Sequence, residues 1–160
     1  MTRRAAASVL ASPELLATWL AWAVLTTAGG TVAGVAPWFV GGLVLGLCQW
    51  FVLRWWVPSA HRWILATVVG VAVGEIVGVV ASEVVSFAVG ATALAVRQWL
   101  TLRRWLPSAW WWLPATAIGW TAGLVLAGTP VVGGVTAVPV AAVGLVTGLA
   151  LVLLLARNER

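Results

Sequence analysis

The chain has 160 residues, of which 62% are hydrophobic and only 8% are charged, whereas about a quarter of the residues in a soluble domain are charged. Its nine basic residues are all arginines, scattered between apolar runs, so they form no continuous patch of the kind that binds nucleic acid. The composition therefore predicts an all-α integral membrane protein and excludes nucleic acid as a partner.

The first predicted element is a cytoplasmic N-terminal tail, residues 1–13. Its apolar stretch is short and ends at Pro13 and Glu14, which argues against a signal peptide. Thirty-nine uncharged residues then precede Arg54. Because one span needs about 20 residues, they predict a first hairpin of two transmembrane helices at about 14–57.

Two further hairpins are predicted at about 62–106, with a turn near 83–86, and at about 111–156, before a short cytoplasmic tail at 157–160. The chain is thus expected to hold six transmembrane helices in one domain, 14–156. Eight of the nine arginines fall on the termini or on the loops between hairpins. The positive-inside rule therefore predicts that both termini are cytoplasmic.

An internal repeat supports the arrangement in three hairpins. Residues 49–70 match residues 98–119 at an offset of 49, with 12 identities in 22 positions. Extending the offset backward places Thr18 at the position of Thr67, and extending it forward places Thr147 at the position of the two repeated glutamines. Because each unit holds two helices, the hairpins are predicted to be parallel repeats around an axis along the membrane normal.

Glycines spaced four residues apart predict how the helices pack. Lipid tails are as apolar as leucine, so membrane helices associate through close contacts of small residues. Glycine stripes occur on several helices, which favours packing within the chain over a dedicated dimer surface. These stripes are Gly42 and Gly46, Gly70, Gly74 and Gly78, Gly119 and Gly123, and Gly144 and Gly148.

A polar layer is predicted about one turn inside the cytoplasmic boundary, with one residue on each helix. The layer is interpreted either as hydrogen bonding that holds the bundle together or as the wall of a cytoplasm-facing vestibule on a pseudo-threefold axis. The structural role is favoured because the layer carries no charge. Its predicted members are Thr18, Gln49, Thr67, Gln98, Thr116 and Thr147.

Tryptophans crowd the predicted cytoplasmic helix ends, where they are typical of an aromatic belt that anchors a bundle at the lipid headgroups. Two Trp–Arg pairs are each spaced four residues apart on one helix, so each pair can form a cation–π contact. A second interpretation is therefore a rim that binds an anionic lipid headgroup. The predicted anchor rim consists of Trp50, Arg54, Trp63, Trp99, Arg103 and Trp112.

Glu75 and Arg97 are ionisable residues within the second hairpin, and such residues need a partner inside a membrane. A turn near 83–86 would bring position 75 opposite about position 94, within reach of Arg97, so an intramembrane ion pair is predicted. The pair is interpreted either as a proton- or ion-responsive site or as a structural pair that fixes one hairpin.

His61, in the first predicted loop between hairpins, is a candidate axial ligand for a tetrapyrrole, but a single histidine supplies no metal site, and no metal is predicted. No cofactor is predicted beyond bound lipid, with a pigment as a further option. No carboxylate pair, metal-ligand cluster or Ser/His/Asp set can be assembled. The chain is therefore predicted not to be an enzyme, and no catalytic residue is assigned.

A Gln-Trp-x-x-Leu-Arg segment occurs at 49–54 and again at 98–103, each time followed by a Pro-Ser-Ala loop and a glycine-striped helix. This pattern resembles a family of bacterial multi-pass membrane proteins that repeat the same hairpin. The resemblance covers nearly the whole chain. It implies the fold and a location in the bacterial inner (cytoplasmic) membrane, but no activity.

Three functions are compatible with these features. The leading hypothesis is an accessory or scaffold subunit that packs against membrane lipids or another membrane protein, in a larger complex or a homo-oligomer, because packing surface is abundant and a reactive constellation is lacking. One alternative is a small transporter or ion-conducting protein, based on the polar layer and the Glu75/Arg97 pair. The other is a lipid or pigment carrier, based on the anchor rim and His61.

Overall fold

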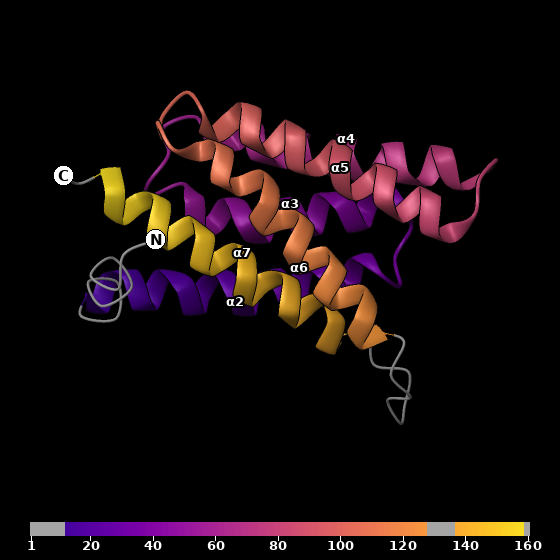
Figure 1. Cartoon of the computed structure of the whole chain (residues 1–160), viewed down its shortest axis with the longest axis horizontal. Helices are drawn as coiled ribbons and strands as arrows, with labels where there is room; N and C mark the ends of the chain where they lie inside the picture. The colour runs from indigo at the N-terminus through magenta and orange to yellow at the C-terminus, as the bar shows by residue number, and fades with distance from the viewer. Residues whose placement is uncertain (1–11, 128–136, 159–160) are drawn as a thin grey trace.

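Six α-helices and one short 3-10 helix form the computed structural model, which describes residues 12–127 and 137–158 (Figure 1). Most of the predicted tail at 1–13 lies outside these residues, and so does the second half of the tail at 157–160. The helices are α2 (Pro13–Ala33), α3 (Trp38–Leu53), α4 (His61–Gly78), α5 (Glu83–Leu102), η1 (Ala109–Trp111), α6 (Trp112–Ala127) and α7 (Ala137–Asn158).

By length and composition, four of these helices could cross a membrane, namely α2, α4, α5 and α7. The other two, α3 and α6, have 16 residues each. Large apolar side chains are exposed on the outside of the bundle, including Val24, Val80 and Ile118. Several apolar helices with an apolar outer surface are the features of a multi-pass membrane protein.

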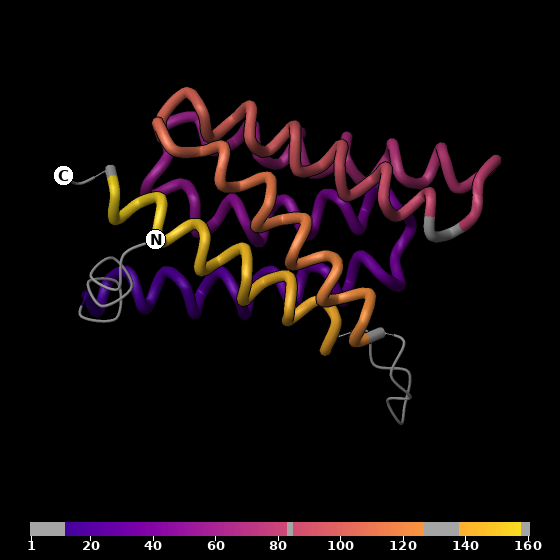
Figure 2. The backbone as a smooth tube through the Cα atoms, viewed as in Figure 1, coloured from indigo at the N-terminus to yellow at the C-terminus, as the bar shows by residue number. Residues whose placement is uncertain are grey.

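The helices form three hairpins arranged as a ring in chain order (Figure 2). Each helix packs against its neighbours in the chain, and α2 also packs against α7, which closes the ring. The start of α2, the end of α7 and the loops α3–α4 and α5–α6 lie together at one end of the bundle (Figure 1). We call it the arginine end, because it carries Arg54, Arg62, Arg103, Arg104 and Arg157.

The turn between α4 and α5, at the opposite end, comprises residues 79–82 and lies earlier than the predicted 83–86. Ser82 caps α5, because its side-chain oxygen accepts a hydrogen bond from the backbone N–H of Val85. The helix therefore begins at Glu83. The earlier start of α5 shifts its register against α4.

A glycine on the first helix of each hairpin faces the same repeat position on the second helix. A Cβ at Gly70 would lie only 2.5 Å from the Cα of Leu94, so a larger residue cannot fit without moving the backbone. The equivalent distance is 2.9 Å for Gly29 and Leu45, and 3.3 Å for Gly119 and Val143. Leu45, Leu94 and Val143 are spaced 49 residues apart, so the three hairpins share one packing geometry.

Glycine also lies in two of the three seams between hairpins. A Cβ at Gly46 of α3 would lie 3.0 Å from the Cα of Ile64 on α4, and a Cβ at Gly144 of α7 would lie 2.9 Å from the carbonyl oxygen of Ala23 on α2. The equivalent residue on α5 is Ala95, whose methyl group keeps α6 farther away. Accordingly, α5 and α6 contact each other least among neighbouring helices, and α6 diverges toward α7 (Figure 1).

Gly70→Ala is expected to destabilise the bundle by about 1–3 kcal/mol, because the added methyl group forces α4 and α5 apart. The measurement is thermal unfolding in detergent, followed by far-UV circular dichroism. Gly34→Ala is the control, since Gly34 is exposed at the end of α2 and has ordinary helical backbone angles. Equal unfolding temperatures for the two variants would contradict the importance of the Gly70 contact.

Candidate functional site

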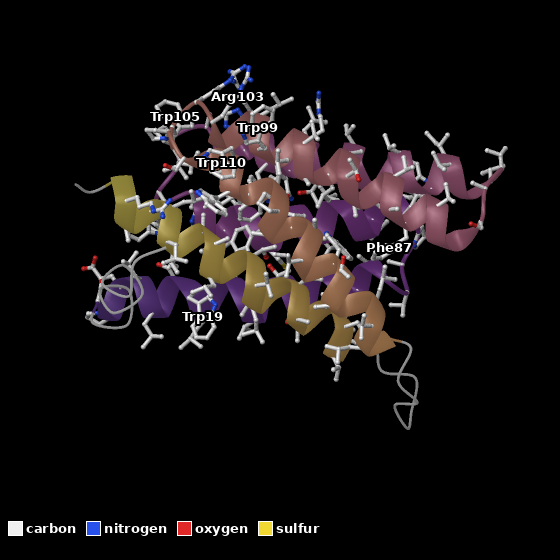
Figure 3. The ribbon with its side chains drawn as sticks, viewed as in Figure 1. Trp19, Phe87, Trp99, Arg103, Trp105 and Trp110 are labelled. Carbon is white, nitrogen blue, oxygen red and sulfur yellow. The ribbon has the colours of Figure 1, made fainter. Side chains whose placement is uncertain are left out.

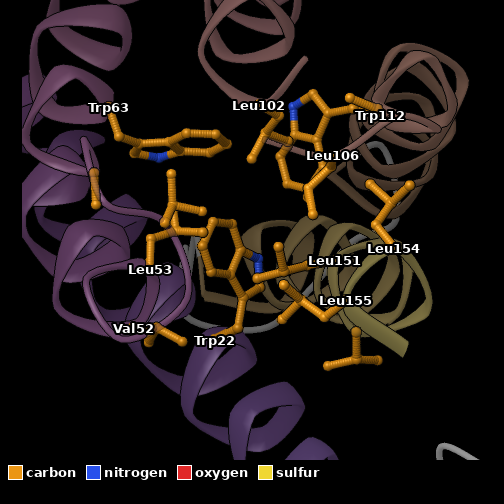
Figure 4. Close-up of a cluster of buried hydrophobic side chains, with 14 of the residues drawn as sticks. Trp22, Val52, Leu53, Trp63, Leu102, Leu106, Trp112, Leu151, Leu154 and Leu155 are labelled. Atoms are coloured by element: carbon orange, nitrogen blue, oxygen red, sulfur yellow. The ribbon is translucent and has the colours of Figure 1, made fainter. Parts of the chain in front are cut away.

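Three tryptophans meet on the axis of the ring (Figure 4). Trp22 of α2, Trp63 of α4 and Trp112 of α6 are at most 1% exposed, and their rings contact one another edge to face at centroid distances of 5.3–5.8 Å. This geometry places the positive edge of one ring against the negative face of the next. Trp63 and Trp112 therefore lie in the core of the bundle and not at the predicted anchor rim.

The three indole N–H groups each donate to a side chain from a different hairpin. Their acceptors are the residues that the offset of 49 aligns, one each on α3, α5 and α7. Thr147 on α7 accepts from Trp22 on α2. The hydrogen bonds therefore join the first helix of the ring to the last, as the packing of α2 on α7 also does. The pairs are Trp63 Nε1 to Gln49 Oε1 (2.8 Å), Trp112 Nε1 to Gln98 Oε1 (3.2 Å) and Trp22 Nε1 to Thr147 Oγ1 (3.0 Å).

The glutamine amides extend this network to threonines. Gln49 Nε2 donates to Thr26 Oγ1 on α2 at 3.3 Å, and Gln98 Nε2 donates to Thr67 Oγ1 on α4 at 3.2 Å. Gln98 Nε2 also lies 3.4 Å from Gln49 Oε1, which joins the two groups. All of these side chains are buried. The hydrogen bonds of the two glutamines form one network from α2 to α6, and the bond between Trp22 and Thr147 is a separate pair beside it.

Thr26, and not the predicted Thr18, belongs to this network. Thr18 is buried but donates to a backbone carbonyl of its own helix at 2.8 Å. The offset of 49 fails in α2 because the first hairpin is shorter than the other two. Between the core tryptophan on its first helix and the acceptor residue on its second helix, it has eight residues fewer. The signal that aligns all three hairpins is Trp-x-x-x-Thr-x-x-Gly, at 22–29, 63–70 and 112–119.

Apolar side chains fill the bundle between the polar layer and the arginine end. Leu53, Leu102 and Leu151 are each 0% exposed, and three more buried residues follow one turn later. This half of the bundle is therefore closed by packed side chains. We call these six residues the apolar plug: Leu53, Leu102, Leu151, Val57, Leu106 and Leu155.

The opposite half of the bundle holds a cavity of about 810 Å³. Residues of the polar layer line it at one end, while Gly34, Gly78 and Pro139 line it near the other ends of α2, α4 and α7. The cavity thus lies on the far side of the polar layer from the arginine end. This placement is the reverse of the predicted vestibule, because the apolar plug occupies the half where that vestibule was expected.

Two polar groups in the cavity wall lack a hydrogen-bond partner within the described part of the chain. They are Thr116 Oγ1, on a residue only 1% exposed, and Trp120 Nε1. Thr26 and Thr67, at the positions equivalent to Thr116, each accept from a glutamine, but α7 carries the shorter Thr147 instead. A buried polar group without a hydrogen-bond partner costs about 1–3 kcal/mol, so a molecule that hydrogen-bonds to these two groups would be favoured.

Glu75 and Arg97 lie at different levels of the second hairpin. Gly74 faces Gly90 across it, so Glu75 lies opposite about position 89, eight residues before Arg97. Eight residues correspond to about 12 Å along a helix, which is beyond the reach of an arginine side chain, and both residues are exposed. The predicted ion pair is therefore not formed, and Glu75 instead lines the cavity.

Aromatic side chains surround the arginines at the arginine end, as the labelled residues around Arg103 show (Figure 3). The guanidinium carbon of Arg54 lies 5.5 Å from the ring centroid of Trp50, and that of Arg103 lies 5.1 Å from the ring centroid of Trp99. These are the cation–π pairs expected from the four-residue spacing. Without Trp63 and Trp112, which lie in the core, the anchor rim consists of Trp50, Arg54, Trp99 and Arg103.

His61 is exposed at the first turn of α4. In the ranges 12–127 and 137–158, no group of three or more His, Cys, Asp or Glu side chains could hold a metal ion. The role of His61 as an axial ligand therefore stays a prediction.

No protein-family model, curated protein or solved structure matches the chain. The resemblance to a bacterial family of repeated hairpins therefore stays a prediction. Any functional proposal must come from the geometry of the cavity, the polar layer and the apolar plug.

Gln98→Leu is expected to destabilise the protein by about 1–3 kcal/mol, because it leaves the buried N–H of Trp112 without an acceptor. The measurement is unfolding in a titration of mild detergent micelles with sodium dodecyl sulfate. Thr92→Val is the control on the same helix, since Thr92 is exposed and donates to its own helix; its effect should stay within about 0.5 kcal/mol. Wild-type stability of Gln98→Leu would show that the network contributes nothing.

Proposed function

We propose that the protein is a non-enzymatic membrane protein that binds an uncharged apolar molecule in the cavity between its helices. The observation that carries this proposal is a cavity of about 810 Å³ whose inner end is a layer of hydrogen-bonding side chains. Pockets that bind small molecules usually measure about 300–1,000 Å³ and combine apolar walls with a few polar groups. This is the lipid or pigment carrier hypothesis, with the binding site inside the bundle instead of at the rim.

The charge distribution favours an uncharged ligand. Within the described part of the chain, Glu75 is the one charged residue that lines the cavity, and the arginines of the arginine end lie beyond the apolar plug. Arg97 is exposed and does not line the cavity. An anionic group would find no cationic partner there, whereas an apolar body with one polar atom matches the walls and the polar layer.

The apolar plug favours binding over conduction. A molecule that enters the cavity meets the polar layer and then three fully buried leucines, so passage to the arginine end would require the helices to separate. This is why the transporter hypothesis ranks second, with Glu75 at the cavity wall as its remaining support. The accessory or scaffold subunit stays a prediction that the cavity neither requires nor opposes.

We further propose that all six helices span a bacterial inner membrane, with the arginine end in the cytoplasm. The ring supports this topology, because it places the shorter α3 and α6 beside helices that are long enough to span. The arginines at one end support the orientation, since basic residues are in excess in cytoplasmic loops, and the exposed tryptophans beside them are typical of a headgroup region.

Single cysteines test this topology in a Cys48→Ala background. Val80→Cys, in the exposed turn between α4 and α5, is expected to react with a membrane-impermeant maleimide in intact cells. Ser108→Cys, in the loop between α5 and α6, is expected to react only after the cells are opened. The reverse pattern would place the arginine end outside the cell, and reaction of both sites in intact cells would contradict six spans.

A cavity-filling variant tests ligand binding. Ala91→Phe places a ring in the cavity from α5, whose contact with α6 leaves room for it, and is expected to remove most of the apolar ligand that the purified protein retains. Retained ligand is measured by native mass spectrometry after gentle extraction. Ala88→Phe is the matched control, since Ala88 is exposed on the same helix and does not line this cavity. If Ala91→Phe retained as much ligand as Ala88→Phe, the cavity would not be the binding site.

A further inference from the structure

We propose that Thr116 and Trp120 bind the carbonyl oxygen of the apolar ligand. This inference rests on the proposed function and assigns the polar contact within the same cavity. It starts from the two buried polar groups that lack a partner, Thr116 Oγ1 and Trp120 Nε1.

The two groups share one face of α6. Thr116 and Trp120 are four residues apart, which makes them neighbours on the helix surface, and both line the cavity. The indole ring of Trp120 contacts Phe87 of α5 edge to face, with the centroids 5.1 Å apart. That contact holds the indole in place on the same helix face as Thr116.

The hydroxyl of Thr116 is unpartnered because the third unit departs from the repeat. The glutamine that would reach it is replaced by Thr147, which accepts from Trp22 and donates to the carbonyl of Val143. The single donor of the Thr147 hydroxyl is therefore used within its own helix. The loss of one glutamine leaves one hydroxyl at the inner end of the cavity.

The N–H of Trp120 is a second departure at the neighbouring position. When the three hairpins are aligned on their Trp-x-x-x-Thr-x-x-Gly segments, Trp120 falls where α2 has Gly30 and α4 has Val71. Those two residues also line the cavity but offer no side-chain donor. The third hairpin alone thus contributes two adjacent, unpartnered donors to the cavity wall.

The chemistry of the two donors defines the ligand atom. An indole N–H can only donate, so the ligand must present an acceptor, and the threonine hydroxyl can donate to the same atom. A carbonyl oxygen has two lone pairs in one plane and accepts from both groups. Because no cationic side chain lines the cavity among the residues that the structure describes, an uncharged carbonyl fits better than a carboxylate. Two sources have this chemistry, the acyl ester of a glycerolipid and a quinone with an apolar tail.

The test uses the delipidated full-length protein and three probes, with binding measured by native mass spectrometry. The probes are the mono-oleoyl ester of glycerol, its mono-oleyl ether counterpart without the carbonyl, and a benzoquinone that carries a decyl chain. Thr116→Val removes one donor and keeps the shape of the side chain, whereas Trp120→Phe removes the other donor and keeps an aromatic ring against Phe87. Thr121→Val is the control, since Thr121 is exposed on the same helix.

The wild-type protein is expected to bind the ester about tenfold more tightly than the ether. Each of the two variants should bind the ester about 3- to 10-fold more weakly, as expected for one lost hydrogen bond, and should bind the ether like the wild type. Thr121→Val should behave like the wild type with every probe. If the wild type bound the quinone but not the ester, and each of the two variants bound the quinone about 3- to 10-fold more weakly, the role of Thr116 and Trp120 would be supported and the source of the carbonyl would be a quinone.

Equal binding of ester and ether, with unchanged quinone binding by both variants, would overturn the inference. If Ala91→Phe abolished probe binding in that case, the cavity would still be the binding site and only the role of the pair would fall. If no probe bound the wild type and Ala91→Phe retained as much native ligand as Ala88→Phe, the proposed function would fall together with the inference.

Discussion

A buried indole N–H without an acceptor is costly, because its apolar surroundings offer no hydrogen bond. In this chain the constraint is met three times around one axis, with Gln49, Gln98 and Thr147 as acceptors. Each acceptor lies on a different hairpin from its donor. The same hydrogen bonds therefore join the hairpins in order and fix their register. They also lie at the level where the packed half of the bundle meets the half that holds the cavity.

The two halves of the bundle differ because side-chain size changes along each helix. Toward the arginine end, leucine and tryptophan repeat in layers and fill the axis. Toward the opposite end, glycine and alanine bring the helices of each hairpin together but leave the axis empty. The departures from the repeat bear on this second half: Ala95 loosens one seam, Thr147 leaves a hydroxyl unpaired and Trp120 adds a donor.

The uncharged runs predicted the hairpins, and the four-residue spacing of glycines predicted close contacts between helices. The repeat supported the hairpins and aligned most of the polar layer, because identical segments pack identically when each must bury the same groups. It misplaced the layer residue of α2, since a shorter hairpin breaks the offset while keeping the Trp-x-x-x-Thr-x-x-Gly spacing. The expected Glu75/Arg97 pair depended on a turn position that a serine cap moved by several residues. Composition alone could not separate Trp63 and Trp112 from the tryptophans at the rim, because all of them lie near helix ends. The cavity depends on three-dimensional packing that no single segment encodes.

The bond between Trp22 and Thr147 spans 125 residues of the chain, and it joins the first helix of the ring to the last. The first hairpin is synthesised long before its final neighbour, so Trp22 lacks its acceptor until α7 has been synthesised. The first two hairpins can pack against each other through α3 and α4 before the chain is complete, but the contact between α2 and α7 needs the last helix. The ring can therefore close only after translation has reached the last helix.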